Sequence, residues 1–258
     1  MDFTNKTAIS TGAASGMGLL FSENFASLGG NVVMADVNEE SLREKVAAIN
    51  AKGCGRAIGV LCDVRDYAQV CSVCDRAVAE FGSIDIMANF AGGTATRMCG
   101  IHRSEHPEFP DVPISVFDWG IDVNLKGPFY FAHAVTKQMR KQNSGLIINI
   151  GSITGAEGSD YGMDYPTSKA GLMYGLTKSL AQFGAKYGIR AVCVSPGPVL
   201  TRAAMANMKT PLGRAADPQE IIDLILFIAS EKGQFINGEN IMIDGGRNAM
   251  GRKVIVYE

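Results

Sequence analysis

Short apolar runs alternate along the chain with longer segments in which apolar residues recur every three or four positions. Runs of about four to eight apolar residues, bounded by glycine or polar residues, are typical of buried strands. We expect strands at 7–11, 31–36, 56–61, 84–88, 145–151, 190–195 and 240–243. The segments with helical periodicity predict helices at 18–28, 39–51, 67–81, 115–141, 161–187 and 218–230. This alternation predicts an α/β fold, a parallel sheet with helices on both faces.

No linker or repeat divides the 258 residues, so we expect one domain over 1–258. The irregular stretch 93–113 is long for a compact domain, and such loops are more often functional than idle. Its basic residues could meet an anionic substrate or could simply be solvated: Arg97, His102, Arg103 and His106. A second substrate loop is expected at 199–216, and the tail 247–258 could shape the pocket or pack on a neighbouring subunit.

Composition and charge exclude several classes of function. A formal net charge of −2 without a basic cluster gives no reason to expect nucleic acid or an anionic membrane as a partner. Neither a leader nor an apolar run of about 20 residues is present, which favours a cytoplasmic protein. The six scattered cysteines are expected to be reduced thiols. Cys71 and Cys74 have the spacing of a metal pair but lack a second pair of ligands, so no metal site is expected.

One pair of residues points to redox chemistry on an alcohol or ketone. Tyr165 and Lys169 are four residues apart on a predicted helix, so the lysine charge can favour deprotonation of the phenol, whose ordinary pKa is about 10. The alternative is an ordinary amphipathic face, and Tyr174 and Lys178 repeat the spacing. Only the first pair follows a strand that ends at a serine, Ser152.

The turn between the first predicted strand and helix is rich in glycine. It reads Thr-Gly-Ala-Ala-Ser-Gly-Met-Gly over residues 11–18, a pattern that allows close approach of a pyrophosphate to a helix N-terminus. Asp36 ends the second strand, where a carboxylate can accept hydrogen bonds from the adenosine ribose and repel a 2′-phosphate. No basic neighbour would neutralise that phosphate, so we expect a preference for NAD of at least about tenfold. A helix N-cap is the alternative role for Asp36.

An ordered set of motifs resembles the short-chain dehydrogenase/reductase family, in its branch of about 250 residues. After the glycine turn come Asp63-Val64, Asn89-Phe90-Ala91-Gly92, Asn124, Ser152, Tyr165 with Lys169, and Pro196-Gly197. The resemblance covers nearly the whole chain. It implies a single Rossmann-like, doubly wound domain with seven parallel strands in the order 3-2-1-4-5-6-7.

The resemblance also implies roles for individual residues. Tyr165 would be the general base in oxidation and the acid in reduction, with Lys169 lowering its pKa and binding the nicotinamide ribose. Ser152 would bind the substrate oxygen and Asn124 a proton-relay water; a turn-forming hydroxyl and a helix-bend residue are the alternatives. Asp63 and Val64 would contact the adenine, Asn89 would hold the end of the fourth strand, and Thr201, with Val199 beside it, would meet the nicotinamide amide. The expected cofactor contacts are Gly12, Ser15, Gly16, Met17, Gly18, Asp36, Asp63, Val64, Asn89, Ala91, Gly92, Tyr165, Lys169, Pro196, Gly197, Val199 and Thr201.

The predicted function is therefore NAD-dependent interconversion of a secondary alcohol and a ketone, on a sugar, polyol or small hydroxy acid. A hydroxysteroid dehydrogenase and a 3-oxoacyl-carrier-protein reductase are alternatives, the latter disfavoured by Asp36 because such enzymes resemble NADPH users. A protein that senses NAD without turnover is the alternative from another class. The resemblance implies a dimer or a tetramer, of which we expect a homotetramer, and Gly171 and Gly175 would allow close helix approach.

Overall fold

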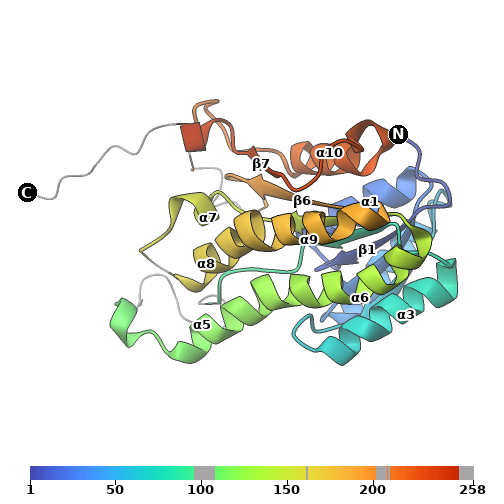
Figure 1. Ribbon diagram of the computed structural model, residues 1–258, viewed down its shortest axis with the longest axis horizontal. Coiled ribbons are helices and arrows are strands. Elements are labelled where there is room, and N and C mark those ends of the chain that lie inside the picture. Colours follow the sequence, from blue (N-terminus) through green and yellow to red (C-terminus); the bar gives the residue numbers. More distant parts are fainter. Residues whose placement is uncertain (96–107, 161, 202–207, 209, 250–258) are drawn as a thin grey trace, which may run out of the picture.

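A computed structural model describes residues 1–95, 108–160, 162–201, 208 and 210–249. These residues form a parallel sheet of seven strands in the order β3-β2-β1-β4-β5-β6-β7, which confirms the predicted fold class and strand order (Figure 1). The strands are β1 (Thr7–Thr11), β2 (Asn31–Asp36), β3 (Ala57–Leu61), β4 (Ile86–Asn89), β5 (Gly145–Ile150), β6 (Ile189–Pro196) and β7 (Asn240–Ile243).

Helices cover both faces of the sheet. They are α1 (Gly16–Ser27), α2 (Glu39–Asn50), α3 (Tyr67–Phe81), α5 (Ile114–Ile121), α6 (Gly127–Gln142), α7 (Thr154–Glu157), α8 (Asp164–Ala170), α9 (Thr177–Gly184) and α10 (Pro218–Ala229). One buried cluster joins the sheet to α1, α2 and α10, and another joins it to α3, α6 and α9. Because both faces are covered, β1 and β5 are buried along their whole length.

Side chains at helix starts explain several boundaries. The Asn38 side chain accepts a hydrogen bond from Ser41 N at α2, and Asp66 accepts two at α3. Asp217 forms a capping box with Glu220 at α10. Such caps satisfy backbone N–H groups that have no partner within the helix.

The two long predicted helices are each interrupted, which corrects the predictions at 115–141 and 161–187. A π-helical segment, η2 (Asp122–Lys126), separates α5 from α6, and another, η3 (Gly171–Leu176), separates α8 from α9. A 3₁₀ turn, η4 (Ala185–Tyr187), follows α9, and α7 is a single turn that periodicity did not predict. A π segment adds one residue to a helical turn, and such segments occur frequently at functional sites.

Some sequence predictions fall outside the described residues. They concern the basic residues Arg97, His102, Arg103 and His106, residues 202–207 and 209 of the expected second substrate loop, and the tail from 250 onward. Within the described residues, no helix is long and apolar enough to cross a membrane. Among the same residues, no group of three or more His, Cys, Asp or Glu side chains could hold a metal ion.

Candidate active site at the carboxyl edge of the sheet

The carboxyl ends of β1, β4, β5 and β6 bring most of the predicted site residues to one edge of the sheet. Here β1 lies between β2 and β4, so the strand order reverses, and open α/β sheets bind ligands at such a point. Buried side chains connect the strand ends. Asn89 Nδ2 on β4 donates to Asn149 Oδ1 on β5 at 3.0 Å, and Asn149 Nδ2 donates to Thr177 Oγ1 at 3.0 Å. The edge is therefore held by a satisfied polar network.

The turn between β1 and α1 has the shape of a phosphate cradle. Gly12 has φ +61°, and a Cβ atom at this position would lie 3.0 Å from Ala91 Cα. Gly16 has φ +55° and open space around it, while a Cβ at Gly18 would lie 2.5 Å from the Gly12 carbonyl oxygen. Ser15 is the N-cap of α1 but makes no side-chain cap bond. The first N–H groups of α1 therefore remain available to an anion, so the turn fits a pyrophosphate.

The segment after β4 lies between this turn and the predicted catalytic residues. Ala91 N donates to Thr11 Oγ1 at 3.0 Å, which ties the segment to β1. A Cβ atom at Gly92 would lie 2.7 Å from Asn124 Oδ1 and 3.5 Å from Lys169 Nζ. The absence of a side chain at Gly92 is what lets the amide and the ammonium approach the backbone.

Asp36 holds the glycine turn from the end of β2. Its Oδ2 accepts from Ala14 N at 3.0 Å and its Oδ1 from Asn38 N at 3.0 Å. The N-cap of α2 is Asn38, so the N-cap alternative for Asp36 is wrong. The carboxylate stays partly exposed beside the cradle.

Asp63 and Val64 follow β3, near the start of α3. Asp63 accepts a bidentate interaction from Arg65, and this hydrogen bonding lowers the pKa of the Asp63 carboxyl. Val64 is buried, and a Cβ at Gly127 would lie 2.8 Å from its Cγ2. The contact of these two residues with an adenine remains a prediction.

Tyr165 and Lys169 lie one turn apart on α8. Lys169 Nζ lies 5.4 Å from the centroid of the Tyr165 ring and donates to Ile150 O, at the end of β5, at 2.7 Å. The lysine side chain is buried, and burial lowers its pKa to about 8. At pH 7 the ammonium is therefore still mainly charged, and its hydrogen bond to a backbone carbonyl fixes that charge beside the phenol.

Asn124 lies in the π segment η2 and is completely buried. Its Oδ1 accepts from Gly93 N at 2.9 Å, and its Nδ2 donates to Gly93 O and to Gly120 O, both at 2.9 Å. The side chain thus joins the helix to the segment after β4. The helix-bend alternative is consistent with this geometry, because the bond to Gly120 O replaces part of the regular helical ladder.

Ser152 stands two residues beyond β5, partly exposed at the start of α7. Its Oγ donates to Thr154 Oγ1 at 3.1 Å and accepts from Thr154 N at 3.2 Å. The turn-forming alternative is therefore consistent with its surroundings. A partly exposed hydroxyl in such a turn remains accessible to a ligand as well.

The turn after β6 contacts two neighbouring strand ends. Ile153 N donates to Pro196 O at 2.9 Å, and Gly197 N donates to Ile243 O at 3.0 Å. A Cβ at Gly197 would lie 2.7 Å from Asp244 Cα, so a larger residue would force the turn apart. The three other predicted cofactor contacts are Val199, which is buried, Thr201, which is exposed, and Met17, which packs partly buried on the core.

Asp164, a buried acid next to Tyr165, escaped the sequence analysis. Its Oδ2 accepts from Ala95 N at 3.4 Å, and a Cβ at Gly120 would lie 2.1 Å from this oxygen. Burial raises the pKa of the Asp164 carboxyl. Asp164 connects α8 to α5 and to the segment after β4; an acid preceding a tyrosine carries no distinctive signal in a single sequence.

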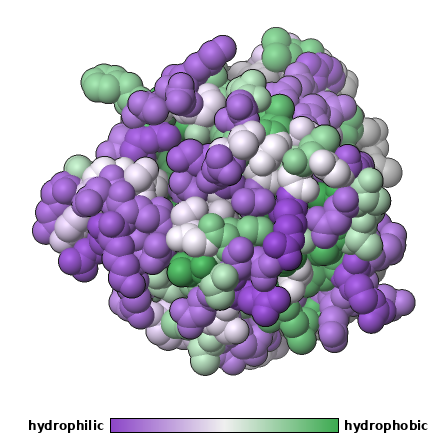
Figure 2. All heavy atoms as spheres, turned by 90° about the vertical axis from the view of Figure 1, so that its right-hand side faces the viewer, coloured by the Kyte–Doolittle hydropathy of each residue, from purple (hydrophilic) through white to green (hydrophobic). Residues whose placement is uncertain are grey.

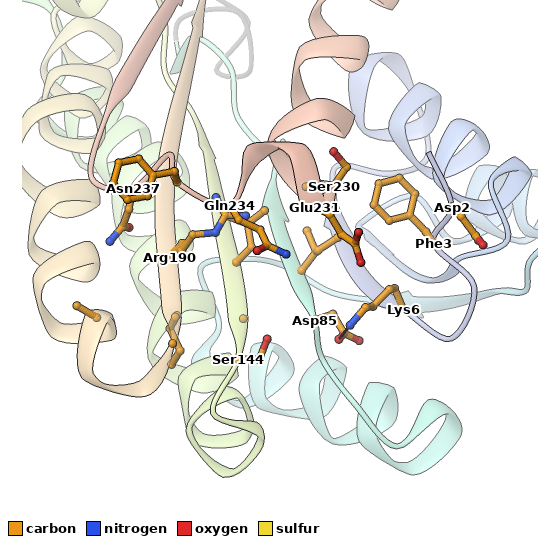
Figure 3. Close-up of a pocket in the computed structure, with 18 residues that line it drawn as sticks. Asp2, Phe3, Lys6, Asp85, Ser144, Arg190, Ser230, Glu231, Gln234 and Asn237 are labelled. Atoms are coloured by element: carbon orange, nitrogen blue, oxygen red, sulfur yellow. Dashed lines mark hydrogen bonds and ion pairs between the residues drawn. The ribbon is translucent and has the colours of Figure 1, made fainter.

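A cavity of about 800 Å³ lies at the opposite, amino edge of the sheet. Its polar lining includes Arg190 and the ion pair between Lys6 and Asp85 (Figure 3). Arg190 also donates to the carbonyls of Gly233, Ile236 and Ile228. Seen from this side, the surface is mainly polar with small apolar patches (Figure 2). None of the predicted catalytic side chains lines this cavity.

Comparison with known proteins identifies similar reductases and dehydrogenases. The family model described as enoyl-(acyl carrier protein) reductase matches residues 12–248. The 3-oxoacyl-[acyl-carrier-protein] reductase of Escherichia coli is 33% identical over 95% of this chain and 98% of its own. The trans-4-hydroxycyclohexanecarboxylate dehydrogenase of Sinomonas cyclohexanicum is 39% identical over 95% of this chain and 93% of its own.

A solved structure agrees with these relatives. The 3-oxoacyl-[acyl-carrier protein] reductase from Brucella melitensis, with NAD bound, superposes with a TM-score of 0.86 at 27% identity. The superposition covers 95% of this chain and 92% of that protein. The chain belongs to the short-chain dehydrogenase/reductase family and is an NAD(P)-dependent oxidoreductase that acts on CH–OH groups.

Proposed function

We propose that this enzyme uses NAD to oxidise a secondary alcohol, with a small hydroxy acid as the leading substrate class. The observation that carries the proposal is the buried Lys169 ammonium, fixed on Ile150 O at 2.7 Å beside the Tyr165 ring. A fixed cation next to a phenol favours the phenolate, which makes the tyrosine a base near neutral pH. Two relatives support the substrate class, the dehydrogenases named for trans- and cis-4-hydroxycyclohexanecarboxylate, at 39% and 34% identity.

In this proposal each catalytic side chain has one task. Tyr165 removes the hydroxyl proton, and Ser152 donates a hydrogen bond to the same substrate oxygen. Lys169 holds its charge beside the phenol, and Asn124 orders a water that passes the proton outward. NAD, when bound at the glycine turn, would supply a hydride acceptor for the carbinol carbon. Reduction uses the same groups in reverse, with Tyr165 as the acid.

The preference for NAD over NADP rests on Asp36. The carboxylate ends β2 beside the phosphate cradle and is held by two backbone N–H groups, so it cannot easily turn away from a 2′-phosphate. Its neighbours Val37 and Asn38 bring no positive charge. We expect kcat/KM with NAD to exceed that with NADP at least about tenfold, and Asp36→Ala to reduce that ratio at least about fivefold. Equal or better efficiency with NADP in the unchanged enzyme would contradict the assignment.

A panel of alcohols tests the substrate class. Absorbance of reduced nicotinamide should rise with NAD and hydroxycyclohexanecarboxylates or other small hydroxy acids, and more weakly with sugars, polyols and hydroxysteroids. The same alcohols as methyl esters are the matched control, because they keep the carbinol and lose the carboxylate. Faster oxidation of the esters, or of a polyol, would assign another class.

Reduction of a 3-oxoacyl thioester is the second candidate. It is favoured by the 33% identity to the Escherichia coli reductase and by the description of the matching family model. Acetoacetyl thioester tested with NADH and NADPH decides between the candidates. Turnover faster than that of every alcohol in the panel would make the reductase function the primary one.

Assembly and location are proposed as well. Exposed aromatic side chains lie along the long helices, with Phe129 48%, Tyr174 52% and Phe183 43% exposed. Exposed apolar surface of this kind favours contact with further copies, and we propose a homotetramer. Light scattering that gives a monomer at micromolar concentration would contradict it. A cytoplasmic location stays a prediction, which fractionation of the source cells would test.

A further inference from the structure

An ion pair connects the residues after β7 to the turn that carries Ser152. Arg247 Nε and Nη2 each donate to the Glu157 carboxylate at 2.9 Å, and each side chain is only 27% exposed. The two residues are far apart in sequence, and Figure 1 shows the segment beyond β7 beside α7. A bidentate arginine–carboxylate pair fixes direction as well as distance, which a single-contact surface pair does not.

On one side of this pair, Glu157 is the last residue of α7, a helix of four residues built on Ser152. Gly155 N donates to Ser152 O at 2.9 Å, and Glu157 N donates to Ile153 O at 2.9 Å. A single helical turn has little stability of its own, so its position depends on what holds its far end. The turn packs on α8, and the Glu157 side chain adds the ion pair at its last residue.

On the other side, Arg247 belongs to a rigid turn. Asp244 accepts from Gly246 N at 2.9 Å and from Asn248 N at 2.6 Å, which fixes the backbone on both sides of the arginine. The same turn accepts a hydrogen bond from Leu212 N, within the segment 199–216 expected as the second substrate loop, through Gly245 O at 3.2 Å. Arg247 therefore joins the serine side of the site to a turn that is fixed in two other ways.

We propose that Glu157 and Arg247 are a positioning pair for Ser152. Neither residue touches the reacting atoms; together they hold α7 so that the serine hydroxyl stays in place relative to Tyr165. The inference rests on the proposed function in one respect, the role of Ser152 in binding the substrate oxygen. It adds two residues that the sequence analysis did not connect with the site.

The test compares Glu157→Gln, Arg247→Gln and the charge-reversed double variant Glu157→Arg/Arg247→Glu with the unchanged enzyme. Each single variant should lower kcat/KM for the best alcohol about fivefold, while the Kd for NADH and the apparent pKa of the pH–rate profile stay unchanged. The double variant should recover to within about twofold. Arg56→Gln is the matched control: it breaks the Arg56–Glu80 pair at the start of β3 and should leave kcat/KM unchanged.

Amide hydrogen exchange supplies a readout that needs no substrate. In the two single variants the amides of 155–158 should exchange faster than in the unchanged enzyme, and in the double variant they should return toward the original rate. Unchanged exchange, unchanged kcat/KM, or a loss that the double variant does not recover would each overturn the positioning role. If the unchanged enzyme oxidises no alcohol, the proposed function fails, and the exchange rates alone then decide whether the pair holds α7.

Discussion

Two tyrosine–lysine pairs with the same spacing follow one another along the helices α8, η3 and α9. In the first pair Lys169 is 4% exposed and its ammonium is fixed on the carbonyl of Ile150. In the second pair Tyr174 is 52% exposed and Lys178 is exposed on the outer surface. The second pair lies in η3 and α9, where both of its side chains are exposed.

The difference shows that the spacing supplies only the opportunity for catalysis. A lysine beside a tyrosine in water has a screened charge and a mobile side chain, so it does little to favour ionisation of the phenol. The same lysine, buried and held by one carbonyl, keeps its charge at a fixed place in a medium of low dielectric constant. The end of β5 supplies the Ile150 carbonyl and the Ser152 turn, and these distinguish the first pair from the second.

Removing the phenol hydroxyl tests the comparison with the largest expected effect. Tyr165→Phe should lower kcat about 1000-fold, because proton transfer to a positioned group contributes about 100-fold to 10,000-fold. Tyr174→Phe should leave kcat within about twofold. Steady-state rates with the best alcohol and NAD measure both, and full turnover by Tyr165→Phe would remove the catalytic assignment altogether.

Removing the ammonium is expected to have the second largest effect. Lys169→Met should lower kcat/KM about 100-fold and weaken NAD binding, since the lysine acts on the phenol and is proposed to bind the ribose. Lys178→Met is the matched control and should change neither value by more than about twofold. Steady-state rates and a fluorescence titration with NADH measure kcat/KM and cofactor binding in both variants. Equal losses in Lys169→Met and Lys178→Met would show that burial of Lys169 does not matter.

The sequence predicted the sheet better than the helices, for a physical reason. The strands at 7–11, 31–36 and 240–243 have the predicted bounds, because short runs of strand-forming residues bounded by glycine or polar residues mark both ends of a strand. The π segments η2 and η3 went unnoticed, because one extra residue in a turn barely changes a helical pattern over a long window. The interruption that holds Asn124 was therefore not predictable from periodicity.

The candidate site was also predicted only in part from the sequence. Motifs located the glycine turn, Ser152, Tyr165 and Lys169 at one edge, because each lies just after a strand or on the helix that follows one. Contacts between distant segments left no local pattern, as with Asp164 at Ala95 or Glu157 at Arg247. The burial that lowers the pKa of Lys169 to about 8 also arises from packing between distant segments, and the spacing of residues along the chain does not reveal it.

A dependence of stability on pH, rather than of turnover, is the last difference that only the first pair should show. Burial lowers the pKa of Lys169 from 10.5 to about 8 in the folded protein. Between these values the unfolded chain binds more protons than the folded one, so the free energy of unfolding rises with pH on account of this group. Relative to Lys169→Met, the unchanged protein should gain up to about 3 kcal/mol between pH 7 and pH 10.5.

Urea unfolding without cofactor at pH 7, 8, 9 and 10 measures this gain as a difference between the two proteins, in which the other titrating groups cancel. The gain should begin near pH 8, because below that value Lys169 is protonated in both the folded and the unfolded state. The same difference taken with Lys178→Met should stay flat, since that lysine is exposed and keeps its hydration on folding. A gain that begins only above pH 10 would place the ammonium in contact with water, and the contrast between the two pairs would then rest on geometry alone.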